Sequence, residues 1–121
     1  MLFVKILIAI TAVLHLGIMY LEMFSAPEKQ AESFGMPLKF VQQENAQIVL
    51  KNMGIYNRSL GLLILASLVL VPASALVMVL SLELIFIIIV GIYGGATVTK
   101  RIYFIQALPA AVALAVLYIF S

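Results

Sequence analysis

The chain has 121 residues, a length typical of a single domain. Its residues are 65% hydrophobic and 10% charged, against about 45–50% apolar and about 25% charged in soluble domains, so a soluble fold of this length could not bury its apolar side chains. The formal net charge of +2 is too small to indicate a nucleic-acid partner, and without cysteine the chain can form no disulfide, thiolate metal site or cysteine nucleophile. We therefore expect the lipid bilayer to be its main partner.

Four apolar stretches are each long enough to cross a bilayer, because the hydrocarbon core needs about 20 helical residues. They cover approximately residues 2–24, 52–71, 75–98 and 102–120. The first stretch is too long for a signal peptide and has no clean cleavage site after it, so we expect it to be retained. The continuous apolar runs differ from the alternating polarity of a membrane barrel. The predicted fold is all-α and polytopic, with one membrane domain over residues 1–121 folded as an antiparallel bundle of four transmembrane helices.

The connections between these stretches predict how the helices are oriented. Residues 25–51 form a polar loop, in which the weakly amphipathic residues 38–50 predict a surface helix or an extension of the next span. The other two connections are very short, which makes the helices on either side antiparallel neighbours. Every lysine and arginine except Lys5 lies in or beside the first and third connections. The positive-inside rule therefore predicts that these two connections are cytoplasmic and that the N- and C-termini lie outside.

His15 and Glu22 are the candidate catalytic residues. They are seven residues apart on the first stretch and so share one helix face, with Glu22 near the cytoplasmic end. Histidine titrates near neutral pH and a carboxylate can orient it, so the pair could transfer a proton or hold a ligand. The structural alternatives are a hydrogen bond between helices for His15 and an interfacial acid for Glu22.

Polar residues on the other three stretches fall in the same half of the membrane as Glu22. In one interpretation, Arg58 pairs with Glu22 while Asn52 and Tyr56 line a cavity; in the other, these residues are ordinary interfacial groups. Because all four stretches contribute polar groups to this half, we predict a polar pocket that opens toward the cytoplasm. The candidate ligand-binding residues are Asn52, Tyr56, Asn57, Arg58, Tyr93, Thr97 and Gln106.

Small residues predict where helices approach closely. Gly91 and Gly95 are four residues apart, a spacing that allows another helix to pack against this face. Ala107, Ala111 and Ala115 form a second stripe of small residues with the same spacing. We expect both faces to serve helix packing.

The remaining ionisable and metal-ligating residues predict little chemistry. Glu83 lies in an otherwise apolar run toward the outer side, where it needs a partner, a water-filled cleft or a proton. His15 and Glu22 would supply two metal ligands, fewer than the three protein ligands usual at a catalytic zinc, so no metal site is predicted. No phosphate-binding loop is present, and the sequence identifies no cofactor.

Four sequence blocks resemble the small membrane proteins catalogued as domain of unknown function 1304. The blocks are residues 15–24 (HLGIMYLEMF), 52–57 (NMGIYN), 91–98 (GIYGGATV) and 106–110 (QALPA). The resemblance covers nearly the whole chain; it implies a four-helix bacterial inner-membrane protein and implies no activity. Members of that family commonly have an aromatic residue after the first block and a glycine after the second. Ser25, Ala26 and Arg58 stand at those places here, so we expect a different pocket rim.

The leading functional hypothesis is a site that binds or processes a small amphiphilic molecule entering from the cytoplasmic leaflet. Whether the protein is an enzyme stays open. In this hypothesis His15 is the acid–base or hydrogen-bonding centre and Glu22 orients it. One alternative is a small proton-coupled transporter, which could act as a homodimer and would use Glu83 as a further protonation point. The other is a non-catalytic subunit that docks onto a membrane complex through its glycine or alanine face.

Overall fold

The computed structural model describes residues 1–121 as helices joined by short connections, with no strand. The elements are α1 (Leu2–Phe24), α2 (Pro27–Phe34), α3 (Leu38–Val41), α4 (Glu44–Leu70), α5 (Ala73–Thr97), the π-helical turn η1 (Tyr103–Ala107) and α6 (Leu108–Phe120). Four helical segments are long and apolar enough to cross a membrane: α1, α4, α5 and the continuous segment of η1 and α6. The predicted all-α, polytopic membrane fold is confirmed.

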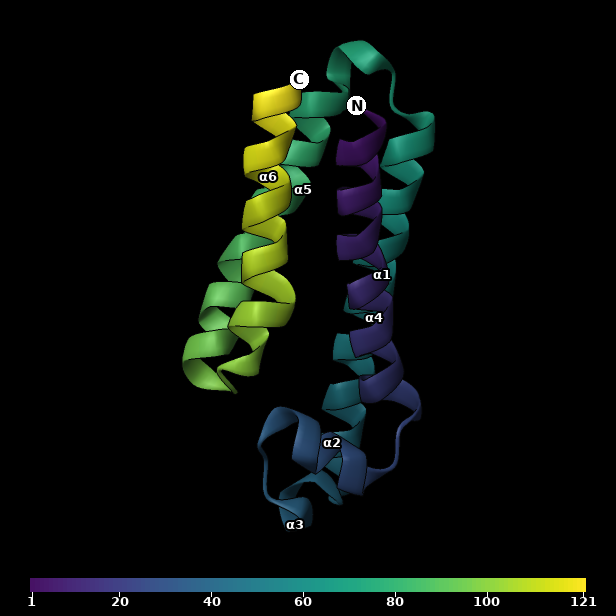
Figure 1. Cartoon of the computed structure of the whole chain (residues 1–121). Helices are drawn as coiled ribbons and strands as arrows, with labels where there is room; N and C mark the ends of the chain where they lie inside the picture. Colours follow the sequence, from purple (N-terminus) through teal and green to yellow (C-terminus); the bar gives the residue numbers. More distant parts are fainter.

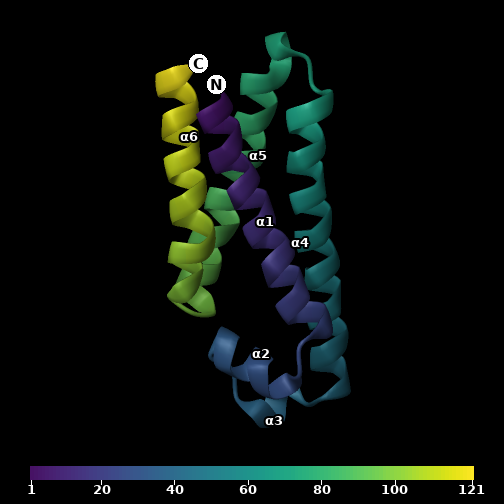
Figure 2. The same cartoon turned by 45° about the vertical axis from the view of Figure 1, so that its right-hand side comes forward.

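The spanning helices form two pairs (Figures 1 and 2). In one pair α1 packs along α4, and in the other α5 packs against η1 and α6. The pairs meet through α1 and α6 near the end of the molecule that holds both termini, and they separate toward the opposite end. The short helices α2 and α3 lie at that opposite end, below the separation.

The apolar core lies toward the end that holds the termini. Along α1 its members are Val4, Ile8 and Ala12, and no residue of α1 beyond Ala12 belongs to it. Past this point, the buried side chains of α1 are His15 and Glu22, both polar. On the outer surfaces of all four spans, large apolar side chains are exposed, as expected for contact with lipid tails. Along α1, the buried side chains therefore change from mostly apolar near the N-terminus to polar near the loop.

Glycines allow the close approach of helices within each pair. In the first pair, a Cβ on Gly61 would lie 2.9 Å from the backbone oxygen of Ala12. In the second, a Cβ on Gly91 would lie 2.7 Å from the backbone nitrogen of Ala107, and one on Gly95 would overlap the ring of Tyr103. The structure thus places the predicted Gly91–Gly95 face against residues 103–107 of the same chain.

The alanine stripe differs from the prediction. Ala111 and Ala115 are exposed, and the buried small residues are Ala107, Ala110 and Ala113. An α-helix has about 3.6 residues per turn, so each step of four residues rotates the side chain by about 40° around the helix axis. Ala111 and Ala115 therefore turn away from the face that holds the buried alanines.

The turn η1 lies just before Pro109. Its π-helical hydrogen bond runs from the N–H of Leu108 to the oxygen of Tyr103, five residues back. Pro109 has no N–H and cannot donate the regular α-helical hydrogen bond. The chain forms this wider, π-helical turn just before the proline.

Helix boundaries in the polar segment follow the alternatives predicted for residues 38–50. The second spanning helix begins at Glu44, so residues 44–50 extend this span, and the predicted loop 25–51 also contains α2 and α3. Residues 44–50 extend the span because no proline or glycine interrupts the chain after the extended backbone of Gln43 (φ −67°, ψ 143°). The third span starts at Ala73, directly after Pro72, which allows helix initiation but cannot sit inside a helix without disrupting it.

Substituting Gly91 tests the close contact in the second pair. Gly91→Ala should lower the free energy of unfolding by about 1–3 kcal/mol, because the new Cβ would force the backbone of Ala107 to move. Gly17→Ala is the matched control, since a Cβ there meets nothing within 4 Å and alanine favours a helix by about 1 kcal/mol over glycine. Thermal unfolding in detergent measures both. Equal stability of the two variants would contradict the proposed contact.

Candidate functional site

A cavity of about 670 Å³ is lined by residues of both helix pairs. Its walls come from α1, α2, α4, α5, η1 and the connection before η1. Fourteen of its 22 lining residues are hydrophobic, and its volume falls within the range of about 300–1,000 Å³ that is usual for small-molecule sites. The cavity is therefore large enough for a small ligand and mostly apolar.

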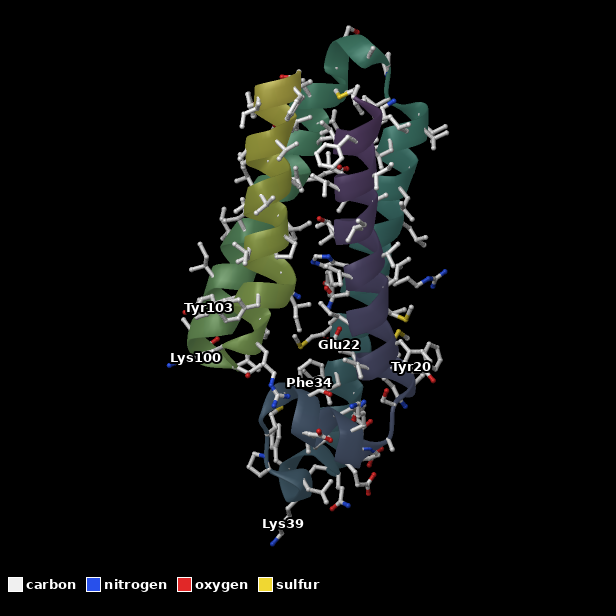
Figure 3. The ribbon with its side chains drawn as sticks, in the orientation of Figure 1. Tyr20, Glu22, Phe34, Lys39, Lys100 and Tyr103 are labelled. Carbon is white, nitrogen blue, oxygen red and sulfur yellow. The ribbon has the colours of Figure 1, made fainter.

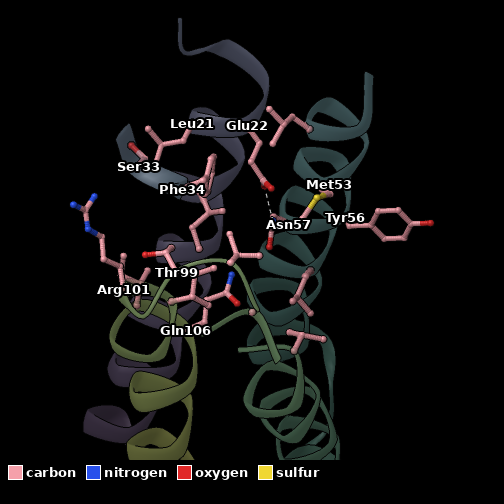
Figure 4. A pocket seen from close by; sticks show the side chains of 18 of the residues that line it. Leu21, Glu22, Ser33, Phe34, Met53, Tyr56, Asn57, Thr99, Arg101 and Gln106 are labelled. Carbon is pink, nitrogen blue, oxygen red and sulfur yellow. Dashed lines mark hydrogen bonds between the residues drawn. The ribbon is translucent and has the colours of Figure 1, made fainter. Parts of the chain in front are cut away.

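The cavity wall carries both apolar and polar side chains (Figure 4). Leu60 and Leu63 of α4, Phe86 and Val90 of α5 and Ile105 of η1 contribute apolar side chains. The hydrogen-bonding side chains are those of Glu22, Ser33, Tyr56, Asn57, Ser59, Thr99, Arg101 and Gln106. Glu22 and Phe34 face the space between the helix pairs, whereas Lys39 and Lys100 project away from it (Figure 3).

Glu22 is the buried acidic residue of this wall, with only 2% of its surface exposed. The side-chain amide of Asn57 donates a hydrogen bond to Oε1 of Glu22 at 2.6 Å, joining α1 to α4 (Figure 4). A hydrogen bond to an ionised carboxylate is among the stronger ones in proteins. The chain donates to one carboxylate oxygen only, so the other retains its capacity to accept.

The partner that sequence analysis considered for Glu22 was Arg58, and the structure places Asn57 there instead. Arg58 is exposed. Successive residues of a helix point about 100° apart, so only one of these two neighbours can face α1.

Gln30 holds α2 against the end of α1. Its side chain is fully buried, and its Nε2 donates to the backbone oxygens of Leu21 and Glu22 at 3.0 and 3.1 Å. The last carbonyls of a helix have no partner within it, so Gln30 supplies the missing donor. In turn, Nε2 of Gln47 on α4 donates to Oε1 of Gln30 and to the oxygen of Val41, both at 2.8 Å.

The other end of α2 is tied to the second helix pair. Arg101 donates from Nη1 to the backbone oxygen of Glu32 at 3.1 Å. Gly35 ends α2 in the left-handed region (φ 63°), and its N–H donates to the oxygen of Ala31. Such a conformation favours glycine, which has no Cβ. Through these contacts α2 connects the two pairs at the loop end and contributes Ser33 and Phe34 to the cavity.

The structure brings some of the predicted site residues to the cavity and leaves others outside it. Glu22, Tyr56, Asn57 and Gln106 line the cavity, although the ring of Tyr56 points away from it and is 77% exposed. The predicted residues outside the lining are His15, Asn52, Arg58, Tyr93 and Thr97. Asn52 and Thr97 hydrogen-bond to backbone oxygens one turn earlier in their own helices.

His15 lies on the same face of α1 as Glu22, yet it is fully enclosed. Its Nδ1 lies 2.9 Å from the backbone oxygen of Thr11. A carbonyl oxygen can only accept, so this contact places the proton on Nδ1 and leaves Nε2 as an acceptor. Nε2 is buried without a partner. His15 is not among the residues that line the cavity, whereas Ile18 and Glu22 of the same helix are.

Glu83 finds a partner on the neighbouring span. The hydroxyl of Ser67 on α4 donates to Oε1 of Glu83 at 2.7 Å, while Oε2 is buried without a partner. A second interhelical contact joins Ser81 of α5 to the hydroxyl of Tyr118 at 3.2 Å. These contacts connect helices in the part of the bundle away from the cavity, where polar side chains strengthen helix association.

Sequence reasoning missed the contribution of the polar segment to the site. Gln30, Gln47, Ser33, Phe34 and Arg101 were not among the predicted residues. An isolated glutamine in a short polar helix carries no spacing signal, and its role follows only from the carbonyls that the fold brings beside it.

Comparison with known proteins extends over the whole of this site. The sequence pattern of the family described as "Protein of unknown function (DUF1304)" matches residues 9–118, a range that includes every residue lining the cavity. The chain is 36% identical over 90 residues to the uncharacterized protein YpaA of Lactococcus lactis subsp. lactis (strain IL1403), with 74% of each protein covered. No solved structure matches the chain.

Replacing Gln30 tests the anchoring of α2. Gln30→Ala should leave buried carbonyls of α1 without a donor, a loss of about 1–3 kcal/mol, and α2 should open more often. We expect faster amide hydrogen exchange across residues 27–41 in this variant. Gln42→Ala, at an exposed position in the same segment, should leave the exchange unchanged. Unaltered exchange in Gln30→Ala would refute the anchoring role.

Proposed function

The chain belongs to the DUF1304 family, whose description names no activity, and we propose that it binds a small amphiphilic molecule in the cavity between its helix pairs. One observation carries the proposal: a buried carboxylate, Glu22, lies in the wall of a large and mostly apolar cavity. Glu22 and Asn57 form the polar end of the proposed site, and the apolar side chains of α4 and α5 form the rest.

The cost of burying Glu22 supports a role in binding. An ionisable side chain inside a membrane span costs about 2.5–3.5 kcal/mol at the centre on insertion scales, and such residues usually mark functional paths or sites. A ligand that hydrogen-bonds to Glu22 supplies a reason for an acid at this place.

The mixed lining of the cavity wall supports an amphiphilic ligand. A polar head would meet the carboxylate and the two amides of Asn57 and Gln106, and an apolar tail would lie against Leu63, Phe86 and their neighbours. Small-molecule sites commonly combine a largely apolar wall with a few directed polar groups. We propose binding rather than catalysis, because the second acid–base group, His15, does not line the cavity.

We propose that the cavity lies on the cytoplasmic side of a bacterial inner membrane. Lys39 and Lys100 project from the end of the molecule that holds the cavity, and both termini lie at the other end (Figures 1 and 3). All basic residues except Lys5 belong to the polar segments at that end or lie beside them. The positive-inside rule then orients the termini outward and lets a ligand enter from the cytoplasmic leaflet.

The transporter hypothesis receives less support from the arrangement of buried groups. It requires His15, Glu22 and Glu83 to act as successive protonation points. Each of them bonds to a different neighbour, and no hydrogen bond joins any two of the three. We therefore place the binding function first.

The hypothesis of a partner subunit loses one of its two proposed docking faces, the glycine face, and keeps the alanine face, where Ala111 and Ala115 are exposed. Gly91 and Gly95 are already packed against residues 103–107 of the same chain. A partner helix would have to displace η1 to reach this face, so the glycine pair supplies no argument for a complex.

Filling the cavity tests the proposed function. Val90→Trp places a large ring in the cavity wall and should abolish any small-molecule adduct that native mass spectrometry detects on the gently purified wild-type protein. Ile89→Trp is the matched control, because Ile89 is the adjacent residue of α5, is exposed and does not line the cavity. Unfolding temperatures of both variants verify the fold. An adduct that survives equally in both would count against this cavity as its site.

Labelling of single cysteines tests the proposed orientation. The chain has no cysteine, so Gln42→Cys and Ser74→Cys each introduce one thiol at an exposed position. In intact cells a membrane-impermeant maleimide should label the variant at residue 74, and it should label the variant at residue 42 only after the inner membrane is opened. The reverse pattern would place the cavity on the outer side.

A further inference from the structure

We propose that the molecule bound in the cavity is a lipophilic amine, with its protonated nitrogen at Glu22 and a single apolar chain along α4 and α5. This inference rests on the proposed binding function and specifies the chemical class of the ligand.

The chain provides no cation to balance Glu22. Asn57 donates from a neutral amide, and Arg58, the neighbouring basic residue, is exposed. Arg101 lines the cavity at its loop side, where its Nη1 is bonded to the backbone oxygen of Glu32. A buried charge is costly unless it is paired with an opposite charge. A ligand can supply the positive charge that the chain does not place beside Glu22.

The free oxygen of Glu22 suits an N–H donor. Asn57 occupies Oε1, so Oε2 is the acceptor that a ligand could use. An ionised carboxylate only accepts hydrogen bonds, whereas an ammonium group has three donors and no acceptor. Besides Glu22, other acceptors line the same cavity: the amide oxygen of Gln106 and the hydroxyls of Ser33 and Thr99.

The aromatic lining adds to the preference for a cation. Phe34, from α2, lines the cavity together with Glu22. The face of an aromatic ring attracts an ammonium group. In contrast, a fatty acid would bring a second carboxylate to Glu22, and a fatty alcohol would bring one donor without a charge.

Three probes with the same chain and different heads test the ligand class. Full-length protein in an uncharged maltoside detergent is titrated at neutral pH with decylamine, decanol and decanoic acid, and the complexes are counted by native mass spectrometry. We expect decylamine to bind at least about tenfold more tightly than decanol, and decanoic acid to bind most weakly.

Two variants then test whether Glu22 causes the preference for the amine. Glu22→Gln keeps the size of the side chain and an acceptor for Asn57, and it should reduce decylamine binding by at least about tenfold while leaving decanol binding unchanged. Glu83→Gln is the matched control, because Glu83 is a partly buried acid of the same bundle outside the cavity lining. It should keep the preference for the amine.

The outcomes separate this inference from the proposed function. Tighter binding of decanol or decanoic acid than of decylamine, or an amine preference that Glu22→Gln retains, would overturn the amine and leave binding in the cavity intact. Failure of all three probes to bind would also overturn the amine proposal. The Val90→Trp comparison then decides whether the cavity binds any molecule. If Glu22→Gln does not fold, the order of the three probes on the wild-type protein still decides.

Discussion

The absence of water from the hydrocarbon core is the constraint on which this structure depends. Polar groups inside the membrane must find partners within the protein, because lipid tails offer none. The hydroxyl of Ser67 donates a hydrogen bond to Glu83, and the backbone oxygen of Thr11 accepts one from Nδ1 of His15. The side chain of Gln30 donates to the last carbonyls of α1. The contacts of Ser67 with Glu83 and of Gln30 with α1 join different helices, so they help to determine which helix faces which neighbour.

Close packing within the pairs, rather than between them, produces the cavity. Gly61 brings α4 onto the backbone of α1, and Gly91 brings α5 onto η1. The two pairs then meet near the termini, where the apolar core lies, and separate toward the loops. At that end α2 connects them, held by Gln30 on one side and Arg101 on the other. A small chain can thus enclose about 670 Å³ without a large domain around it.

The chemistry of the cavity follows from one incompletely satisfied group. Glu22 accepts a hydrogen bond from Asn57, and no basic residue of the chain lies on its other oxygen. Glu83, in contrast, is not among the residues that line this cavity, and its Oε1 accepts from Ser67. Each glutamate thus joins two helices through one oxygen, and Glu22 is the one that also lines a space that a ligand can fill.

The sequence by itself determined the class of fold, because four apolar runs of about 20 residues have no stable alternative to membrane helices. It also determined that Glu22, Asn57 and Gln106 belong to one end of the bundle, since helix rise converts position into depth. Only the tertiary structure decided that Asn57 rather than Arg58 faces Glu22, that His15 lies outside the cavity, and that Gln30 anchors α2. Depth follows from counting residues along one helix, whereas contact depends on how each helix is rotated toward its neighbour, and that rotation is set by the packing of the whole bundle.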